Sequence, residues 1–238
     1  IEQFWLSYID ALIKKKQFNI AKQALEQAKT QGLAGEKLNV LKAQLASINK
    51  QETVGSLSPS QEQRNSLLEH YQNGRFDEAE KLAVSITNEF PKHQFGWGVL
   101  GAVLKQTGRA IDSLTAMQKS VKLAPQDPEA HNNLGVTLQE QGKLEEAQAS
   151  YNQAIALKPD YAKAHNNLGA ILQELGRLAE AEASYNQAIV LKPHYAEAHN
   201  NLGAMLQELG RLAQAEASYN QAIAFKPNYA EAHSNLGN

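Results

Sequence analysis

The sequence has no cysteine, which excludes disulfide bridges, thiolate nucleophiles and cysteine-ligated zinc. Aromatic residues are scarce, at 7% of the 238 residues, and no apolar run reaches the roughly 18 to 20 residues that a membrane-spanning helix needs. The chain contains 23 Lys and Arg residues and 25 Asp and Glu residues, so basic residues are not in excess. Such a chain is poorly suited to bind a phosphate backbone. We therefore expect a soluble protein, by default cytoplasmic, whose partners are neither nucleic acids nor membranes.

Repetition is what the sequence has in abundance. Its clearest unit covers residues 162–195, and a nearly identical copy follows over residues 196–229. A fixed period of 34 residues predicts a solenoid, in which each copy packs only on its neighbours. Positions are numbered within a copy from its first residue, so that Ala162 is position 1. The copies in this phase are 60–93, 94–127, 128–161, 162–195, 196–229 and the partial copy 230–238.

Each copy contains two blocks of apolar residues at helical spacing. In the copy 162–195 the first block centres on Leu172 and the second on Tyr185. Gly176 lies between them and supplies the left-handed backbone that commonly ends a helix. Pro193 ends the second block because proline cannot donate to a helical ladder. We therefore predict a helix, a tight turn and a second helix in every copy.

These landmarks resemble the tetratricopeptide repeat, which has small residues at positions 8, 20 and 27 and a proline at position 32. In the clearest copy these positions hold Gly169, Ala181, Ala188 and Pro193. The resemblance implies an all-α, right-handed superhelical solenoid of stacked antiparallel helix pairs, with the first helix of each pair lining a concave groove. The amino-acid sequence of the copies is most similar to that of the repeats of O-linked N-acetylglucosamine transferases and related bacterial repeat proteins.

The first fifty residues are less regular. Residues 2–29 fit one degenerate copy, with Trp5 and Tyr8 in its core, and residues 36–50 predict one further helix. A polar stretch with glycine and proline follows and is typical of a loop. We therefore divide the chain into degenerate N-terminal helices (1–50), a linker or hinge (51–59) and the repeat array (60–238).

Several motifs that resemble sites of chemistry fit the repeat better. Gly96, Gly98 and Gly101 spell G-x-G-x-x-G, but a nucleotide fingerprint needs a strand before it, and none is predicted. Paired carboxylates such as Glu145 and Glu146 fall on a solvated face. We therefore predict no catalytic residue and no cofactor. Gly98 remains unusual, because glycine in the interior of a helix lowers its stability. A glycine at this position indicates close packing or a flexible joint.

Histidine recurs at position 4 of successive copies. Equivalent helices of a solenoid lie about 8 to 10 Å apart, too far for two imidazoles to share one zinc ion at about 2.0 to 2.1 Å. We therefore predict histidines that pack in the core and no metal site. These residues are His131, His165, His199 and His233.

On the first helix of each copy, positions 2, 6, 9 and 13 lie opposite the core positions. Asparagine recurs at position 6, although it is a poor residue for a helix interior. Its amide offers an acceptor and two donors, which match the backbone of an extended peptide. We name this row the asparagine ladder: Asn133, Asn167, Asn201 and Asn235. Charged residues of the same face complete the predicted groove: Glu129, Glu140, Lys163, Glu174, Glu197 and Glu208.

Another interpretation stays open for the ladder: its amides could bond to neighbouring copies, or persist because the copies duplicated recently. The asparagines at position 5 and the glutamines at position 12 point elsewhere, and we expect hydrogen bonds between copies from them. We call the bound polypeptide segment the guest. A groove rich in glutamate should favour a neutral or basic guest over an acidic one.

The sequence therefore predicts a non-enzymatic scaffold that binds an extended segment of a partner polypeptide. Because the chain starts at Ile1 and stops nine residues into a copy, we expect a fragment of a longer protein. One alternative is that it recruits substrates for a larger transferase. Another is self-association into a homo-oligomer through the open end of the array, around Tyr219 and Ile223.

Overall fold

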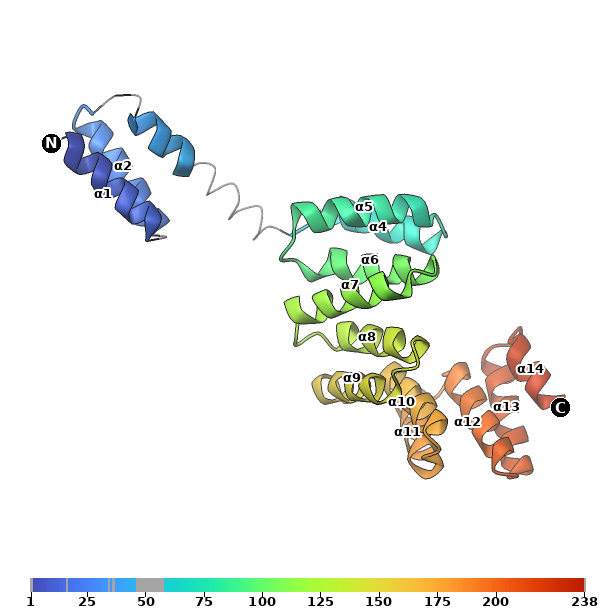
Figure 1. Ribbon diagram of the computed structural model, residues 1–238. Coiled ribbons are helices and arrows are strands. Elements are labelled where there is room, and N and C mark those ends of the chain that lie inside the picture. The colour runs from blue at the N-terminus through green and yellow to red at the C-terminus, as the bar shows by residue number, and fades with distance from the viewer. Residues whose placement is uncertain (1, 16, 34, 36, 46–57, 238) are drawn as a thin grey trace. The chain divides into compact units, whose positions relative to one another are not determined.

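Every element of secondary structure in the described part of the chain is a helix (Figure 1). The computed structural model describes residues 2–15, 17–33, 35, 37–45 and 58–237. None of the described helices is long and apolar enough to cross a membrane. Contacts divide the chain into two units, the first with residues 1–60 and 88–93, the second with residues 61–87 and 94–238.

The first unit contains α1 (Glu2–Lys14), α2 (Phe18–Thr30) and a helix over residues 37–45. The pair α1 and α2 covers the residues for which a degenerate copy was predicted, and their assignment as such a copy stays a prediction. The third helix packs on the pair through one shared core. The rest of the predicted helix 36–50 and most of the predicted linker 51–59 lie outside the described residues. The core includes Ile9, Leu12, Leu25, Leu38 and Leu41.

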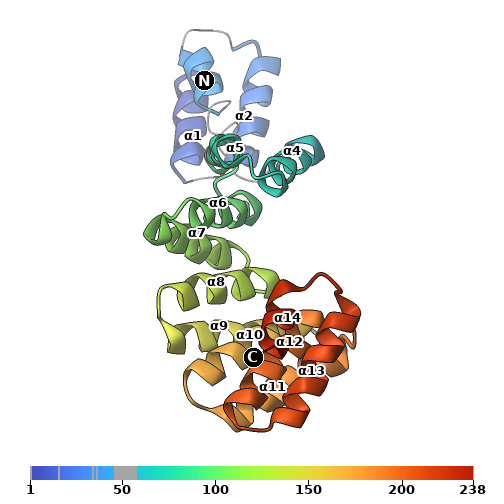
Figure 2. The same cartoon turned by 90° about the vertical axis from the view of Figure 1, so that its right-hand side faces the viewer.

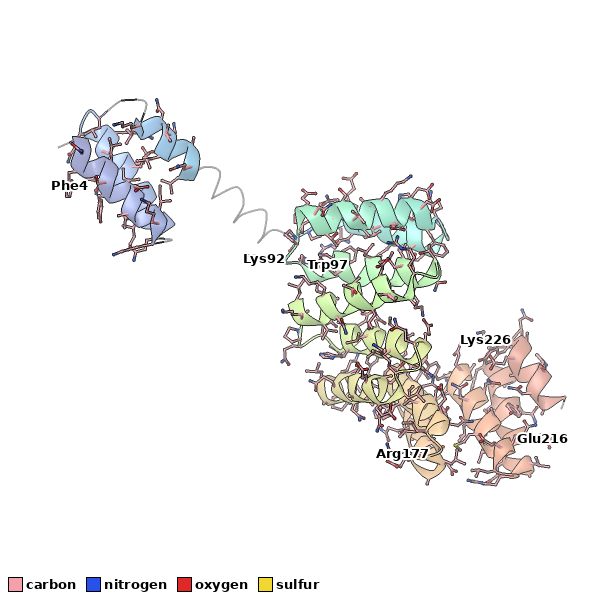
Figure 3. All side chains as sticks on the ribbon, in the orientation of Figure 1. Phe4, Lys92, Trp97, Arg177, Glu216 and Lys226 are labelled. Carbon is pink, nitrogen blue, oxygen red and sulfur yellow. The ribbon has the colours of Figure 1, made fainter. Side chains whose placement is uncertain are left out.

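The prediction that Tyr8 lies in the core was wrong, because 42% of this residue is exposed. Its ring stacks on that of Phe4, labelled in Figure 3, with 6.0 Å between the ring centroids. Ile9, one residue further around α1, is fully buried in its place. Trp5 is partly buried, and its indole N–H donates to Gln31 Oε1 over 3.2 Å. At this level of α1 the core residue is thus Ile9 instead of Tyr8, while Leu12 and the partly buried Trp5 still face the core.

The second unit is a series of antiparallel helix pairs, each stacked on the next (Figures 1 and 2). The second helix of one pair contacts the first helix of the following pair from α7 onward. The predicted helix-turn-helix copies are thus present. The helices are α4 (Gln61–Gln72), α5 (Phe76–Glu89), α6 (Gln94–Gln106), α7 (Ala110–Leu123), α8 (Pro128–Glu140), α9 (Leu144–Leu157), α10 (Ala162–Glu174), α11 (Leu178–Leu191), α12 (Ala196–Glu208), α13 (Leu212–Phe225) and α14 (Ala230–Leu236).

The turn inside each pair depends on a glycine at position 15. At Gly176 φ is +72°, a left-handed conformation that a residue with a Cβ atom rarely adopts. The N–H of Arg177, three residues after the end of α10, donates back to the carbonyl oxygen of Leu172 over 2.8 Å and closes the turn. Equivalent glycines with positive φ are Gly74, Gly108, Gly142 and Gly210.

Within the regular pairs the two helices meet at a glycine and a tyrosine. A Cβ atom added to Gly169 would lie 2.7 Å from the ring of Tyr185, closer than real contacts allow. The ring is 1% exposed and fills the space between α10, α11 and the next first helix, where it packs with Leu202. The same arrangement joins Gly135 to Tyr151 and Gly203 to Tyr219. A small residue at position 8 is therefore what allows the aromatic ring at position 24 to be buried.

The three glycines of the G-x-G-x-x-G stretch lie inside α6. An added Cβ would meet Ile86 at 2.9 Å from Gly96 and Met117 at 2.9 Å from Gly101. At Gly98 the nearest atom is Ser120 Oγ, 3.3 Å away, a looser contact with a group that can rotate. Gly96 and Gly101 are thus explained by helix packing, whereas packing explains Gly98 only in part.

We predict that Gly169→Ala lowers the free energy of unfolding by about 1–3 kcal/mol, because the new methyl group overlaps the buried Tyr185 ring. Guanidinium denaturation followed by circular dichroism measures the loss. Gly98→Ala is the matched control, since its methyl meets only the Ser120 hydroxyl and alanine favours the helix. An equal loss in both variants would contradict this account of the packing.

Candidate functional site

The first helices of the second unit carry a polar row beside their buried face. At position 6, Asn133 and Asn167 are half-buried, as is the small residue Ala170 at position 9. The position-5 asparagines, Asn132 and Asn166, are buried. The two adjacent asparagines of a copy therefore differ in environment, and only that at position 6 is accessible to a ligand.

Side-chain amides connect successive copies in a fixed pattern. The Nδ2 of Asn167 donates to Oδ1 of Asn132 in the preceding copy over 3.0 Å. Asn201 donates to Asn166, and Asn235 to Asn200, over 3.1 Å each. The position-5 asparagines thus make the hydrogen bonds between copies that their sequence pattern predicts, and the ladder asparagines are the donors.

Each of these ladder amides keeps part of its hydrogen-bonding capacity. Asn167 and Asn201 use one amide proton each, and within the described residues their Oδ1 atoms and second protons have no partner. Among those residues, the one buried side-chain polar atom without a partner is His70 Nδ1. The unpaired amide atoms of the ladder are therefore accessible, and each amide can serve both as donor and as acceptor.

Asn133 departs from the pattern, because the preceding copy has Gly98 at position 5 and offers no amide acceptor. Its Oδ1 accepts a long bond of 3.5 Å from Asn132 Nδ2, and its own Nδ2 donates to no described residue. The ladder is thus interrupted at the junction between the copies 94–127 and 128–161.

A second hydrogen-bonded row runs from the buried tyrosines to the groove. The hydroxyl of Tyr185 donates to Gln173 Oε1 over 3.1 Å, and Gln173 Nε2 donates to Glu208 of the next copy over 2.9 Å. Tyr151, Gln139 and Glu174 repeat the arrangement one copy earlier. Burial, reinforced by nearby carboxylates, raises the pKa of Tyr185 well above its usual range. Each of these Tyr–Gln–Glu rows thus holds a glutamate of the predicted groove in place by hydrogen bonds that start at a tyrosine buried in the preceding helix pair.

The charged residues of the predicted groove differ in how they are neutralised. Glu140 pairs with Lys105 over 2.9 Å, and Glu197 pairs with Lys226 over 3.1 Å. Burial opposes ionisation of Glu197, but a backbone N–H and Lys226 hold the pKa of its carboxyl below its usual range. Within the described residues no cation pairs with Glu174 or Glu208. The groove therefore keeps uncompensated negative charge over the copies 162–229.

A hollow of about 510 Å³ opens on the same face, between α4, α6 and α8. It brings together three predicted groove residues, Glu129, Asn133 and Lys163. The other seven do not line it. Apolar side chains form much of its wall: Leu68, Phe95, Val99 and Ala102 from the less regular copies 60–93 and 94–127, and Val136 from the copy 128–161. The sequence pattern did not reveal this hollow, although Gly98 and Val99 replace the asparagines of positions 5 and 6 there.

The position-4 histidines do not lie in the core, which corrects that prediction. The Nε2 of His165 lies 3.0 Å from the carbonyl oxygen of Pro159, and because a carbonyl can only accept, the ring donates. The ring ties the start of α10 to the loop before it. His131, His199 and His233 contact Pro125, Pro193 and Pro227 in the same way. No group of three or more potential metal ligands occurs in the part of the chain that the structure describes.

The end of the array also differs from expectation. Tyr219 was expected to be partly exposed, yet only 2% of it is accessible. Its ring packs against Gly203, and its hydroxyl donates to Gln207 over 2.8 Å. Leu236 of α14 joins the same cluster. Seven further helical residues are thus enough to cover this face, and Ile223 is half-buried.

These features define a helical-repeat solenoid with a row of accessible polar side chains along its first helices. Comparison with known families gives the class of repeat: a tetratricopeptide repeat model matches residues 160–228, another matches residues 116–149, and a TPR repeat model matches residues 138–176. The chain therefore contains tetratricopeptide repeats over residues 116–228. None of the curated protein sequences compared with the chain matches it.

Solved structures share the fold. A thermophilic TPR protein of Thermus thermophilus, TTC0263, is 25% identical with a TM-score of 0.65, and the match covers 74% of this chain and 96% of that one. MamA is 23% identical with a TM-score of 0.58, over 68% of this chain and 95% of that one. YrrB, described as a TPR protein with an unusual peptide-binding site, is 16% identical with a TM-score of 0.56, over 74% and 91%. The resemblance to O-linked N-acetylglucosamine transferases stays a prediction.

We predict that Asn167→Ala lowers the free energy of unfolding by about 1–3 kcal/mol, because it leaves the buried Oδ1 of Asn132 without a donor. Chemical denaturation measures the loss. Asn133→Ala is the matched control and should cost less, since Asn133 donates to no described neighbour. If both variants lose the same stability, the hydrogen bond between copies contributes little.

A further prediction concerns Tyr185→Phe at alkaline pH. The folded chain keeps the Tyr185 proton, whereas the unfolded chain releases it near pH 10, so the free energy of unfolding falls as the pH rises above about 10. The variant should lose about 0.5–1.5 kcal/mol at pH 7, where the hydrogen bond to Gln173 is missing. Its stability should then fall less steeply than that of the wild type above about pH 10. Parallel pH profiles would contradict the burial of this phenol.

Proposed function

We propose that the second unit is a scaffold that binds an extended segment of another polypeptide along its first helices and catalyses no reaction itself. One observation carries the proposal: from residue 128 onward, amide groups with unpaired donors and acceptors recur once per copy on one accessible face. An extended backbone presents N–H and C=O groups at regular intervals, which such amides can bond whatever the side chains are.

The energetics call for several of these contacts at once. One hydrogen bond contributes a net of about 0.5–1.5 kcal/mol, whereas micromolar affinity needs about 8 kcal/mol. The four ladder asparagines alone would not suffice, so burial of guest side chains and charge pairing must add to them. The peptide-binding site named for YrrB supports this use of the fold by analogy.

Charge defines the preferred guest further. Glu174 and Glu208 lie on the groove face without a cationic partner among the described residues. A guest with lysine or arginine opposite these carboxylates would gain attraction, and an acidic guest would be repelled. We therefore infer a neutral to basic guest.

The same groove would serve if the chain recruits substrates for a larger transferase, and the mass of the native polypeptide separates that role from a free-standing scaffold. Self-association through the end of the array loses its main support, because Tyr219 is buried. Light scattering over a concentration series tests it: a monomer at every concentration excludes it.

The test uses random twelve-residue peptides displayed on phage and selected on the immobilised chain. Selected peptides, labelled with fluorescein, are titrated with wild type and with Glu174→Gln combined with Glu208→Gln. Glutamine keeps an acceptor for the Gln139 and Gln173 bonds but removes the charge. We expect about tenfold weaker binding, an unchanged melting temperature, and binding in the wild type that weakens with added salt.

Two carboxylates outside the groove provide the matched control. Glu145→Gln combined with Glu216→Gln removes the same charge from exposed sites on second helices; Figure 3 labels Glu216 on α13. This variant should bind like the wild type. Selection of no peptide at all, or equal weakening in both double variants, would overturn the proposed groove.

A further inference from the structure

We propose that the guest is anchored in the hollow at Gly98, where a large apolar side chain enters and Asn133 holds the adjoining backbone. This inference rests on the proposed function and adds where on the groove the guest is fixed and which side chain it must carry.

The break in the asparagine ladder is the first argument. At three successive junctions the ladder asparagine donates to a position-5 asparagine of the preceding copy. Gly98 occupies position 5 before Asn133, and glycine has no side chain to accept the bond. Within the described residues Asn133 consequently keeps both amide protons, while the other ladder asparagines have already used one each. Its Nδ2 is the ladder donor with the greatest remaining capacity for a guest.

The room left by Gly98 is the second argument. Gly98 and Asn133 both line the hollow of about 510 Å³, a volume within the usual range of roughly 300–1,000 Å³ for ligand sites. The same missing side chain that frees the Asn133 amide therefore also opens the space in front of it. A backbone group bonded to Asn133 would place its neighbouring side chain in this space.

The composition of the wall is the third argument. The copy 94–127 has Phe95 at position 2 and Val99 at position 6, where the regular copies carry charged residues and asparagine. Ala102 and Val136 continue the apolar wall. A large apolar side chain would lose contact with water against these residues. The charged residues that also line the hollow, Lys105, Asp127, Glu129 and Lys163, carry two positive and two negative charges.

Charge complementarity fixes the remainder of the guest. Two acids and two lysines line the hollow, so charge does not select the residue directly beside the apolar side chain. Glu174 and Glu208 follow in the later copies and favour cations there. The inferred partner is thus an extended polypeptide segment with a large apolar residue, followed at a distance by lysine or arginine.

The test places an asparagine at residue 98, so that the copy 94–127 regains the position-5 asparagine of the regular copies. Where position 5 is asparagine, position 27 is alanine, as in Asn132 with Ala154, whereas Gly98 faces Ser120. Gly98→Asn combined with Ser120→Ala therefore copies a combination that this fold already contains. Gly98→Ala combined with Ser120→Ala is the matched control, since it adds a methyl group without an amide.

Peptides selected on the wild type serve as probes, measured by fluorescence anisotropy. We expect the asparagine variant to bind about tenfold or more weakly at an equal or higher melting temperature. The alanine variant, which fills less of the hollow and adds no acceptor for Asn133, should lose clearly less affinity than the asparagine variant. Replacing the large apolar residue of the peptide by alanine should also cost about tenfold or more. If the asparagine variant fails to fold, Ala102→Leu tests the hollow independently, because the leucine fills it without a polar group.

The outcomes separate this inference from the proposed function. If peptides bind and respond to Glu174→Gln with Glu208→Gln but not to the asparagine variant or to Ala102→Leu, the groove stands and the anchor at Gly98 is refuted. If no peptide is selected, the proposed function itself fails. If Ala102→Leu weakens binding and the asparagine variant does not, the hollow binds the side chain, but the assigned role of Asn133 is wrong.

Discussion

The contact of a glycine at position 8 with a tyrosine ring at position 24 determines the geometry on which the array depends. The pairs Gly135–Tyr151, Gly169–Tyr185 and Gly203–Tyr219 bring the two helices of a copy together until no Cβ atom fits between them. Each ring then reaches the next copy, so that one core is shared by neighbours. Because the same contact recurs every 34 residues, each first helix packs on its neighbours in the same way, and equivalent outer residues form rows.

The asparagine row joins the copies and, in the proposed function, also binds the guest. The amides of Asn167 and Asn201 join copies to one another, and the atoms that they leave unpaired are available to a guest. The interpretation that the asparagines only connect copies and the interpretation that they bind peptide are therefore compatible for these residues. At Gly98 the structural bond is missing, and the freed amide of Asn133 coincides with a hollow. A ladder asparagine thus either donates an amide proton to the preceding copy, as Asn167 does, or keeps it within the described residues, as Asn133 does.

The fold could be predicted from the sequence alone, whereas the candidate site could not. Period, Gly176 and Pro193 predicted the helix pairs correctly, because chain reversal and small-residue packing are local constraints. The predicted burial of Tyr8 and of the position-4 histidines was wrong. In both cases the burial of the side chain depends on its neighbours in space, which the spacing of residues in the sequence does not reveal. The hollow arises from residues of several copies, and only a position-by-position comparison of Gly98 and Val99 with the regular copies could have indicated it.

A crystal structure of the chain with a selected peptide tests the central claim most directly. The account predicts an extended peptide along the first helices, with a large apolar side chain between Val99 and Val136 and a peptide carbonyl oxygen accepting from Asn133 Nδ2. A peptide bound to the second helices or to the first unit, or one in the groove that leaves the hollow at Gly98 empty, would contradict it.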